Sequence, residues 1–288
     1  MTLVQPSSTE RLFVALPGDA GPGPETQPGT DCIRALAIPS ALGGVVGQAL
    51  IYRETFPAGE PMVERVLPDG ALRIGIDLSG TNPAPLVLGP RSRPDSVPLR
   101  GRMEGLSLTI RQAAARAMLG IPVGDVTGND VPLAELWGPV AQEFGGRLAE
   151  AGDDEARAAV LWDSLRLRMA GAAAEPLPWL VASQVACGQE AQIVRQGLGV
   201  SERRVQQLFR EHVGLSPRSV ARLSRWHRLL RRLRGVERPN WAGLAVGHGW
   251  YDQAHLIRDF RAFSGLTPTE YFSRAISGSS KNGQPASG

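Results

Sequence analysis

The hydrophobic positions follow one period in the first part of the chain and another after about residue 112. Between about residues 46 and 110, short apolar runs alternate with polar positions and stop at Gly- and Pro-containing turns such as Pro68-Asp69-Gly70. A period of two with such stops predicts short strands of an antiparallel sheet or a small barrel. Pro68-Asp69-Gly70 is interpreted as a hairpin turn.

Beyond residue 112 the apolar residues recur at intervals of three and four, which is the period of an amphipathic helix. This spacing predicts three helices, over residues 112–120, 133–146 and about 154–170. Residues 171–178 form the candidate linker to a further segment with a helical pattern. In that segment we expect Cys187 to be a buried apolar residue.

The chain of 288 residues is long enough for two domains of about 100–200 residues each. Residues 17–29 are rich in Gly and Pro, and the carboxyl end is small and polar. We therefore predict a disordered segment over 1–35, ordered domains over 36–172 and 173–277, and a disordered tail over 278–288.

A repeat with an offset of 51 residues lies in the second predicted domain. The sequence SERRVQQLFREHVGLSP begins at Ser201, and DQAHLIRDFRAFSGLTP begins at Asp252. Ser and Asp are residue types that cap a helix amino terminus, and the glycine of each copy suits the left-handed residue that ends a helix. The Ser-Pro or Thr-Pro that follows starts another helix, and Glu270 can complete a capping box.

Each repeated helix is preceded by a shorter helical segment, over residues 191–198 and 241–248, that ends in glycine. A short helix, a tight turn and an amphipathic helix make a helix-turn-helix, whose second helix lies in the major groove of DNA. The predicted fold class is therefore α+β. An amino-terminal small β-barrel or sheet with following helices precedes a carboxyl-terminal all-α domain with two helix-turn-helix units.

Both second helices have an apolar stripe and a polar face. The stripes are Val205, Leu208 and Phe209 in the first helix and Leu256, Phe260 and Phe263 in the second. The candidate DNA-binding residues are Arg203, Gln206, Gln207, Arg210, Gln253, Ala254, His255, Ile257, Arg258 and Arg261.

The polar residue types suit base recognition. Arg can bond to guanine and Gln to adenine, each with about 1–3 kcal/mol of discrimination. Two roles stay open for His255: a contact to a DNA phosphate and a structural hydrogen bond within the protein. The helix predicted between the copies, residues 217–234, would span about 27 Å, comparable with the ~34 Å between successive major-groove faces.

Charge is divided unevenly between the two parts of the chain. Residues 1–182 contain 15 Arg and 21 acidic side chains, whereas residues 183–276 contain 15 Arg and only 7 acidic side chains. The basic part suits a polyanion such as DNA. The run Arg231-Arg232-Leu233-Arg234 is interpreted as solvated or near phosphate.

The scarcity of certain residue types argues against several classes of function. Lys281 is the only lysine, and all four histidines lie at or after position 212, so the first domain offers no lysine or imidazole for catalysis. No catalytic residue, metal site or cofactor is predicted. Two cysteines indicate a reducing compartment, and interruptions in the apolar stretch 36–52 argue against a membrane span. We expect a cytoplasmic protein without membrane association.

The segment GVSERRVQQLFREHVGLSP followed by LAVGHGWYDQAHLIRDFRAFSGLTPTEYF resembles the DNA-binding domain of the AraC/XylS family of bacterial transcription regulators. The resemblance covers about residues 178–275. It implies that both second helices read DNA, by position through Arg203, Gln206, Gln207, Ala254 and Arg258, and that the protein acts on RNA polymerase. Arg195 departs from the family, which usually has a small Ala there.

A weaker resemblance over about 50–170 is to an uncharacterised amino-terminal domain in one branch of these regulators. It implies a sensory or assembly module, and therefore a small-molecule effector or a homodimer as further partners. Two alternatives remain open. One is an enzyme in the amino-terminal barrel, with the DNA-binding half as a localising module. The other is an architectural DNA binder without sequence preference.

Overall fold

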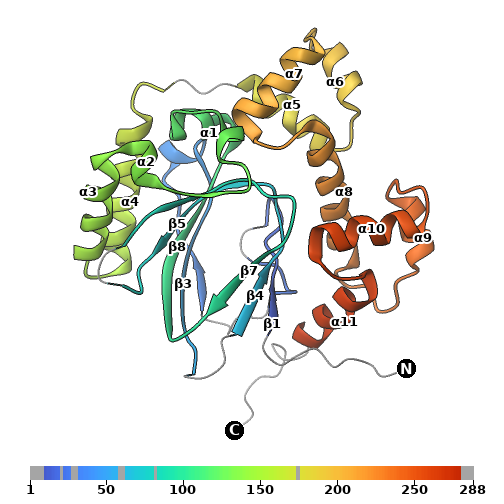
Figure 1. Ribbon diagram of the computed structural model, residues 1–288, viewed down its shortest axis with the longest axis horizontal. Coiled ribbons are helices and arrows are strands. Elements are labelled where there is room, and N and C mark those ends of the chain that lie inside the picture. Colours follow the sequence, from blue (N-terminus) through green and yellow to red (C-terminus); the bar gives the residue numbers. More distant parts are fainter. Residues whose placement is uncertain are drawn as a thin grey trace.

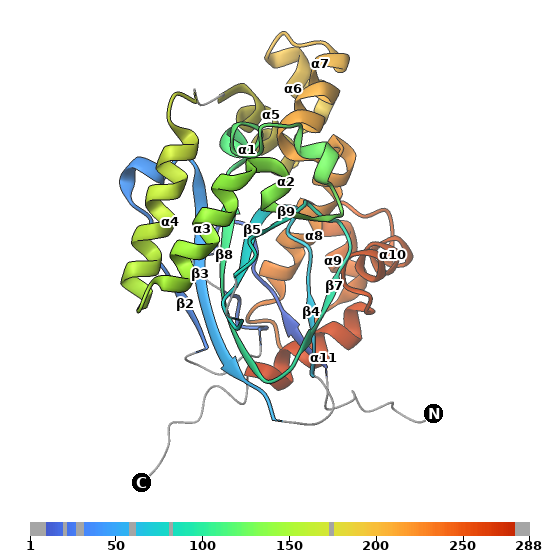
Figure 2. The same ribbon diagram turned by 60° about the vertical axis from the view of Figure 1, so that its left-hand side comes forward.

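The structure, a computed structural model, describes residues 10–19, 22–26, 32–57, 62–80, 83–172 and 176–279. Within these residues the elements lie in successive layers (Figures 1 and 2). Two helices, α3 Pro139–Glu150 and α4 Asp154–Met169, cover a six-stranded sheet, and a three-stranded sheet faces it from the other side. Beyond the smaller sheet lie the carboxyl-terminal helices α8 Pro217–Leu233, α10 Gln253–Ser264 and α11 Pro268–Ser279. The predicted α+β class is confirmed.

The six-stranded sheet is antiparallel throughout. Strands β8 and β5 lie at its centre, and β3 pairs with β8 over most of its length. On β5 the apolar residues Leu72, Ile74 and Ile76 are buried while the residues between them are not. This alternation gives the sheet one face that packs on helices. In spatial order the strands are β2 Ile33–Ala35, β3 Val46–Thr55, β8 Arg102–Ile110, β5 Leu72–Asp77, β6 Leu86–Leu88 and β9 Asp130–Pro132.

The three-stranded sheet has β4 at its centre. Strand β1 pairs with β4 in parallel and β7 pairs with β4 antiparallel. The strands are β1 Glu10–Phe13, β4 Met62–Val66 and β7 Asp95–Leu99. The described strands thus form two separate sheets, and the larger one has β2 and β9 as its edge strands. Of the two predicted arrangements, a sheet is therefore correct for these residues and a closed barrel is not.

Helices pack on the outer face of the larger sheet and bury its apolar stripe in one core with Met118, Phe144 and Leu161. They are α1 Gln112–Leu119, α2 Leu133–Trp137, α3 Pro139–Glu150 and α4 Asp154–Met169, with 3-10 turns η1 Ser40–Leu42 and η2 Val123–Val126. The prediction of a single helix over residues 133–146 is wrong. Gly138 has a positive φ of 62° and Pro139 starts a new helix, so the segment is divided into α2 and α3.

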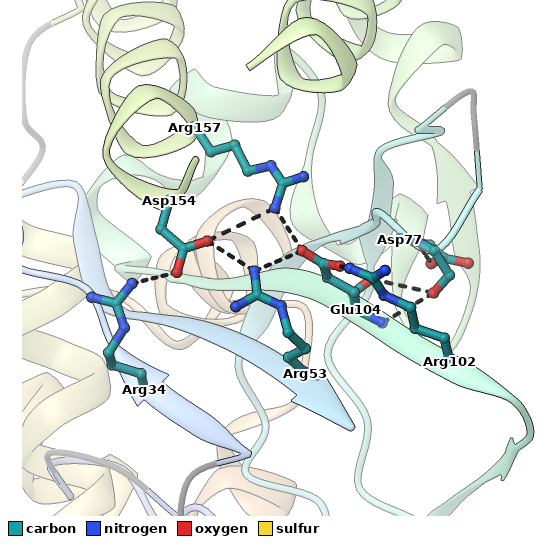
Figure 3. A network of polar contacts seen from close by, with 8 residues as sticks. Arg34, Arg53, Asp77, Arg102, Glu104, Asp154 and Arg157 are labelled. Carbon is teal, nitrogen blue, oxygen red and sulfur yellow. Dashed lines mark hydrogen bonds and ion pairs between the residues drawn. The ribbon is translucent and has the colours of Figure 1, made fainter. Parts of the chain in front are cut away.

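A network of ion pairs attaches α4 to the larger sheet (Figure 3). The buried carboxylate of Glu104 accepts hydrogen bonds from Arg53, Arg102 and Arg157, and Asp154 joins Arg53 to Arg34. Burial by itself raises the pKa of Glu104, but the hydrogen bonds from the three arginines outweigh it and lower the pKa to about 2. The network therefore holds an ionised carboxylate beneath the first turn of α4.

The carboxyl-terminal part of the described chain is helical, with one turn of π-helix. Its elements are α5 Pro176–Ala186, α6 Ala191–Gly197, α7 Glu202–Leu208, the π-helical turn η3 Phe209–Val213, α8 Pro217–Leu233, α9 Trp241–Gly247, α10 Gln253–Ser264 and α11 Pro268–Ser279. Trp226 of α8 is fully buried at the centre of their common core. Helix α5 begins inside the predicted linker, at Pro176.

Several expectations need correction. Residues 10–13 form β1 and Val14 and Leu16 are buried, so the predicted disorder over 1–35 is wrong for the described residues of that range. Residues 1–9, 20–21, 27–31 and 280–288 lie outside the described residues. Asp69 and Gly70 form a turn, but it connects β4 of one sheet to β5 of the other and is not a hairpin. Cys187 follows the end of α5 and is exposed, not buried.

Candidate nucleic-acid interface

The first helix-turn-helix unit consists of α6, a turn at Gly199 and α7, which continues into the π-helical turn η3. Gly199 has a φ of 65°, and the side chain of Ser201 accepts a hydrogen bond from the Arg204 backbone N–H. The segment ends at Gly214, with a φ of 81°. The predicted stripe of Val205, Leu208 and Phe209 is buried, which fixes the face that α7 turns outward.

The second unit consists of α9, a turn at Gly249 and α10. The Asp252 side chain accepts a hydrogen bond of 2.6 Å from the His255 backbone N–H, and Gly265 ends the helix with a φ of 72°. Leu256, Phe260 and Phe263 are buried. The caps that the repeat predicted are therefore present in both units.

All ten candidate DNA-binding residues lie at least partly at the surface. His255 and Ile257 are half-buried, and His255 Nε2 lies 4.0 Å from the carboxylate of Asp259. This pair is too far apart for a hydrogen bond, so Asp259 does not give His255 the structural hydrogen bond of the second alternative. The exposed residues are Arg203, Gln206, Gln207 and Arg210 of the first unit and Gln253, Ala254, Arg258 and Arg261 of the second.

Helix α10 is anchored to α8 through Asp259, a residue that the sequence analysis did not identify. Its buried carboxylate accepts hydrogen bonds from Arg222 at 2.6 Å, Arg225 at 3.0 Å and the Trp250 indole at 2.9 Å. Arg225 also lies over the Trp250 ring and donates to the Gly249 carbonyl. The position of Asp259 on an apolar stripe, three residues after Leu256, was a sequence signal that its carboxylate is buried and paired, but it did not identify the partners.

Burial alone raises the pKa of Asp259, but the hydrogen bonds from Arg222, Trp250 and Arg225 outweigh it and lower the pKa below its usual value. The carboxylate is therefore ionised at neutral pH and fixes the orientation of α10, with Arg258 on its exposed side. In the first unit the equivalent position is the buried Leu208, so α7 is held by apolar contacts there.

Residues 196–274 match the family model of a helix-turn-helix domain. Residues 196–274 are an AraC-type helix-turn-helix domain. Among proteins with curated descriptions, none matches the chain.

The chain is also similar to solved structures of ToxT from Vibrio cholerae. One crystal form is 12% identical, with 79% of this chain and 98% of that chain covered, at a TM-score of 0.40. The structure of ToxT bound to (E)-4-(8-methylnaphthalen-1-yl)but-3-enoic acid is 11% identical in sequence, with 79% of this chain and 98% of that chain covered. Its TM-score is 0.38. The structure of ToxT bound to an unsaturated fatty acid is 12% identical, with 78% of this chain and 94% of that chain covered, and its TM-score is 0.36.

The AraC-type domain is attached to the amino-terminal domain near α7, the second helix of the first unit. Arg210 forms an ion pair of 3.3 Å with Asp125, and Glu211 one of 2.6 Å with Arg116. The Thr127 hydroxyl donates to the Gly214 carbonyl at 2.8 Å. These contacts fall on and next to the π-helical turn η3, while the corresponding part of α10 is regular α-helix. They were not predicted from the sequence.

Helix α8 joins the two units of the AraC-type domain and is itself attached to the amino-terminal domain (Figure 1). Burial lowers the pKa of His227 to about 4, and its ring Nε2 donates to the Pro68 carbonyl at 2.9 Å. Arg234 forms ion pairs with Asp19 and Glu25. The interpretation of residues 231–234 as solvated or near phosphate is therefore wrong for Arg234.

In the residues that the structure describes, no helix is long and apolar enough to cross a membrane. The same residues include no group of three His, Cys, Asp or Glu side chains arranged to hold a metal ion. The AraC-type domain supports a DNA-binding transcription regulator.

Proposed function

We propose that this chain is a transcription regulator that binds double-stranded DNA sequence-specifically and reads two adjacent major grooves. The observation that carries the proposal is the pair of second helices in the AraC-type domain. Each buries its apolar stripe and exposes a face with Arg and Gln side chains, and the same caps bound both. Arginines near phosphates supply affinity through counterion release, and the exposed faces supply sequence selection.

The residues proposed to contact bases or phosphates are the ten candidates at the surface of the two helices. Arg258 is the strongest of them, because it is exposed on the helix that Asp259 fixes against α8. An Arg in this position can donate two hydrogen bonds to guanine. Gln206 and Gln207 suit adenine, and Ile257 suits a thymine methyl group.

The two domains have different proposed roles. Residues 36–172 sense an effector or mediate assembly, including homodimer formation, and residues 173–277 bind DNA. The resemblance over residues 178–275 implies that the bound regulator acts on RNA polymerase in a bacterial cytoplasm. The described β1, which lies before residue 36, belongs with the first of these domains through its pairing with β4.

The two alternatives make different predictions. An architectural DNA binder would bind any duplex with similar affinity at one salt concentration. An enzyme would turn over a substrate in the amino-terminal domain. The AraC-type domain favours a regulator over an enzyme.

Selection of bound fragments from random and genomic DNA tests the proposal. We expect enrichment of one motif with two conserved blocks. In competition binding, random duplex should compete about 10³-fold or more weakly than the selected site. Equal competition by the two DNAs at fixed salt would support the architectural binder and refute the proposal.

A further inference from the structure

An apolar cavity of about 400 Å³ lies between the two sheets, on the face of the larger sheet that the helices α1 to α4 do not cover. Leu50 and Leu88 line it from the larger sheet, and Phe13 and Val97 line it from the smaller one. Leu50 is buried although it belongs to neither apolar core of the described residues. The volume suits a small organic ligand, because such sites range over about 300–1,000 Å³.

The polar lining of the cavity has an excess of negative charge. Six acidic residues and four arginines line it. On its inner wall the two carboxylates of Glu54 and Glu64 share the guanidinium of Arg11, at 2.8 Å each. Burial raises the pKa of Glu64 despite the neighbouring Arg11. A second cation beside Glu64 would balance the charge of this cluster, because carboxylates taken out of water need a paired cation.

Tyr52 also lines the cavity, and its hydroxyl lies against Gly105. A Cβ atom on the facing Gly105 would lie 2.2 Å from it, so only glycine leaves room for the ring. Burial, with the charges of Asp77 and Glu64, raises the pKa of Tyr52 to about 12. A neutral phenol, two carboxylates and an apolar wall together suit a ligand with a cationic donor group and an apolar body.

We propose that this cavity binds a small, largely apolar molecule with a protonated amine, which contacts the carboxylates of Glu54 and Glu64. The same charges disfavour a ligand with a carboxylate. The ligand class follows from the lining residues of this chain alone.

The smaller sheet is a common wall between the cavity and the AraC-type domain. On β1, Arg11 and Phe13 line the cavity, whereas Leu12 between them is packed in the core of the carboxyl-terminal helices. On β4, Glu64 and Val66 line the cavity.

The side chain between these two β4 residues points the other way. Arg65 donates a hydrogen bond of 3.2 Å to the carbonyl of Ser264, the last residue of α10. Its partner Glu10 also forms an ion pair with Arg274 of α11. A ligand that moves β1 or β4 therefore acts directly on the second recognition helix, and this coupling rests on the proposed DNA-binding function.

Titration calorimetry of the full chain with three matched probes tests the ligand class: 4-phenylbutylamine, 4-phenyl-1-butanol and 4-phenylbutyrate. We expect the amine to bind about tenfold or more tightly than the carboxylate, with the alcohol between them. Equal affinities, tighter binding of the carboxylate, or no binding by any probe overturns the proposal.

Two variants locate the binding site. Glu64→Gln should weaken amine binding about tenfold and leave alcohol binding unchanged, whereas the exposed Glu143→Gln on α3 should change neither. If Glu64→Gln fails to fold, Val97→Trp, which fills the cavity from the smaller sheet, should abolish binding of all three probes. Unchanged amine binding in a folded Glu64→Gln or Val97→Trp chain overturns the assignment.

DNA binding is measured separately, on the selected site with and without saturating amine. Coupling predicts a change in DNA affinity of about 5- to 150-fold in either direction. Amine binding with unchanged DNA affinity overturns the coupling through the smaller sheet. A chain that binds the amine but selects no DNA would leave the cavity assignment standing and refute the proposed function.

Discussion

Replacement of Asp259 by Ala should destabilise the AraC-type domain and disorient its second recognition helix. The carboxylate is buried and accepts three hydrogen bonds of 2.6, 2.9 and 3.0 Å. Breaking a buried ion pair costs about 3–5 kcal/mol when the remaining partner is stranded in the interior. The Arg222 side chain is 40% exposed and can rehydrate, whereas the Arg225 side chain is only 20% exposed. We therefore expect a loss of about 2–4 kcal/mol.

Urea denaturation followed by tryptophan fluorescence gives this free energy of unfolding. Asp163→Ala is the matched control, because Asp163 forms an exposed ion pair with Arg166 on α4. It should change stability by less than about 1 kcal/mol.

DNA binding by Asp259→Ala should also fall more at the selected site than on random duplex, since α10 loses its fixed orientation. Equal unfolding midpoints for Asp259→Ala and Asp163→Ala would refute the reasoning.

The pH dependence gives a second check on the same residue. The folded-state pKa of Asp259 lies below its usual value of 3.8, so its contribution to stability is present above pH 3.8 and is lost as pH falls further. The stability of the native chain should therefore decrease more steeply below pH 4 than that of Asp259→Ala. If the free energies of unfolding of the two chains fall in parallel below pH 4, the result would contradict the hydrogen bonds assigned to Asp259.

Three further predictions concern other parts of the molecule. Arg258→Ala should cost about 1–3 kcal/mol on the selected site and much less on random DNA in binding titrations, and equal losses would make Arg258 a phosphate contact. Glu104→Gln should lower the free energy of unfolding by about 1–3 kcal/mol at pH 7. Because the folded pKa of Glu104 is about 2, this difference should shrink as pH falls from about 4.5, and a pH-independent difference in urea titrations would argue against the ion-pair network. Asp125→Asn should release Arg210 from its ion pair and raise DNA affinity. The increase should be at most about fivefold, because both side chains of the pair are largely exposed. Weaker DNA binding by this variant would contradict the idea that Asp125 competes with DNA for Arg210.

The sequence was most informative where local chemistry decides the structure. Ser201, Asp252, Gly214 and Gly265 each fix a helix end through their own backbone conformation or side-chain oxygen, so the limits of the recognition helices could be predicted within a residue or two. The buried and exposed faces followed from helical periodicity alone.

The sequence was least informative where distant segments meet. Strand β1 has only four residues and lies just before the Gly- and Pro-rich residues 17–29, and it is held by its pairing with β4. The Asp259 anchor needs Arg222 and Arg225 from another helix, and no local signal shows that pairing. The turn at Asp69 was identified correctly, but the strands on either side of it were assigned to one hairpin because pairing partners depend on the whole sheet.

The contacts of the first recognition helix with the amino-terminal domain also depend on segments that are distant in the sequence. Asp125 and Arg210 are 85 residues apart, and each is unremarkable in its own segment. Long-range ion pairs of this kind need the packed fold before they can form.

Hydroxyl-radical footprinting of the full chain on a selected DNA fragment tests the central proposal most directly. Two recognition helices on one rigid α8 should protect two segments whose centres lie about 10 base pairs apart, on one side of the duplex. Arg258→Ala should weaken protection of one segment only. A single short protected segment, or uniform protection along the fragment, would contradict the reading of two adjacent grooves.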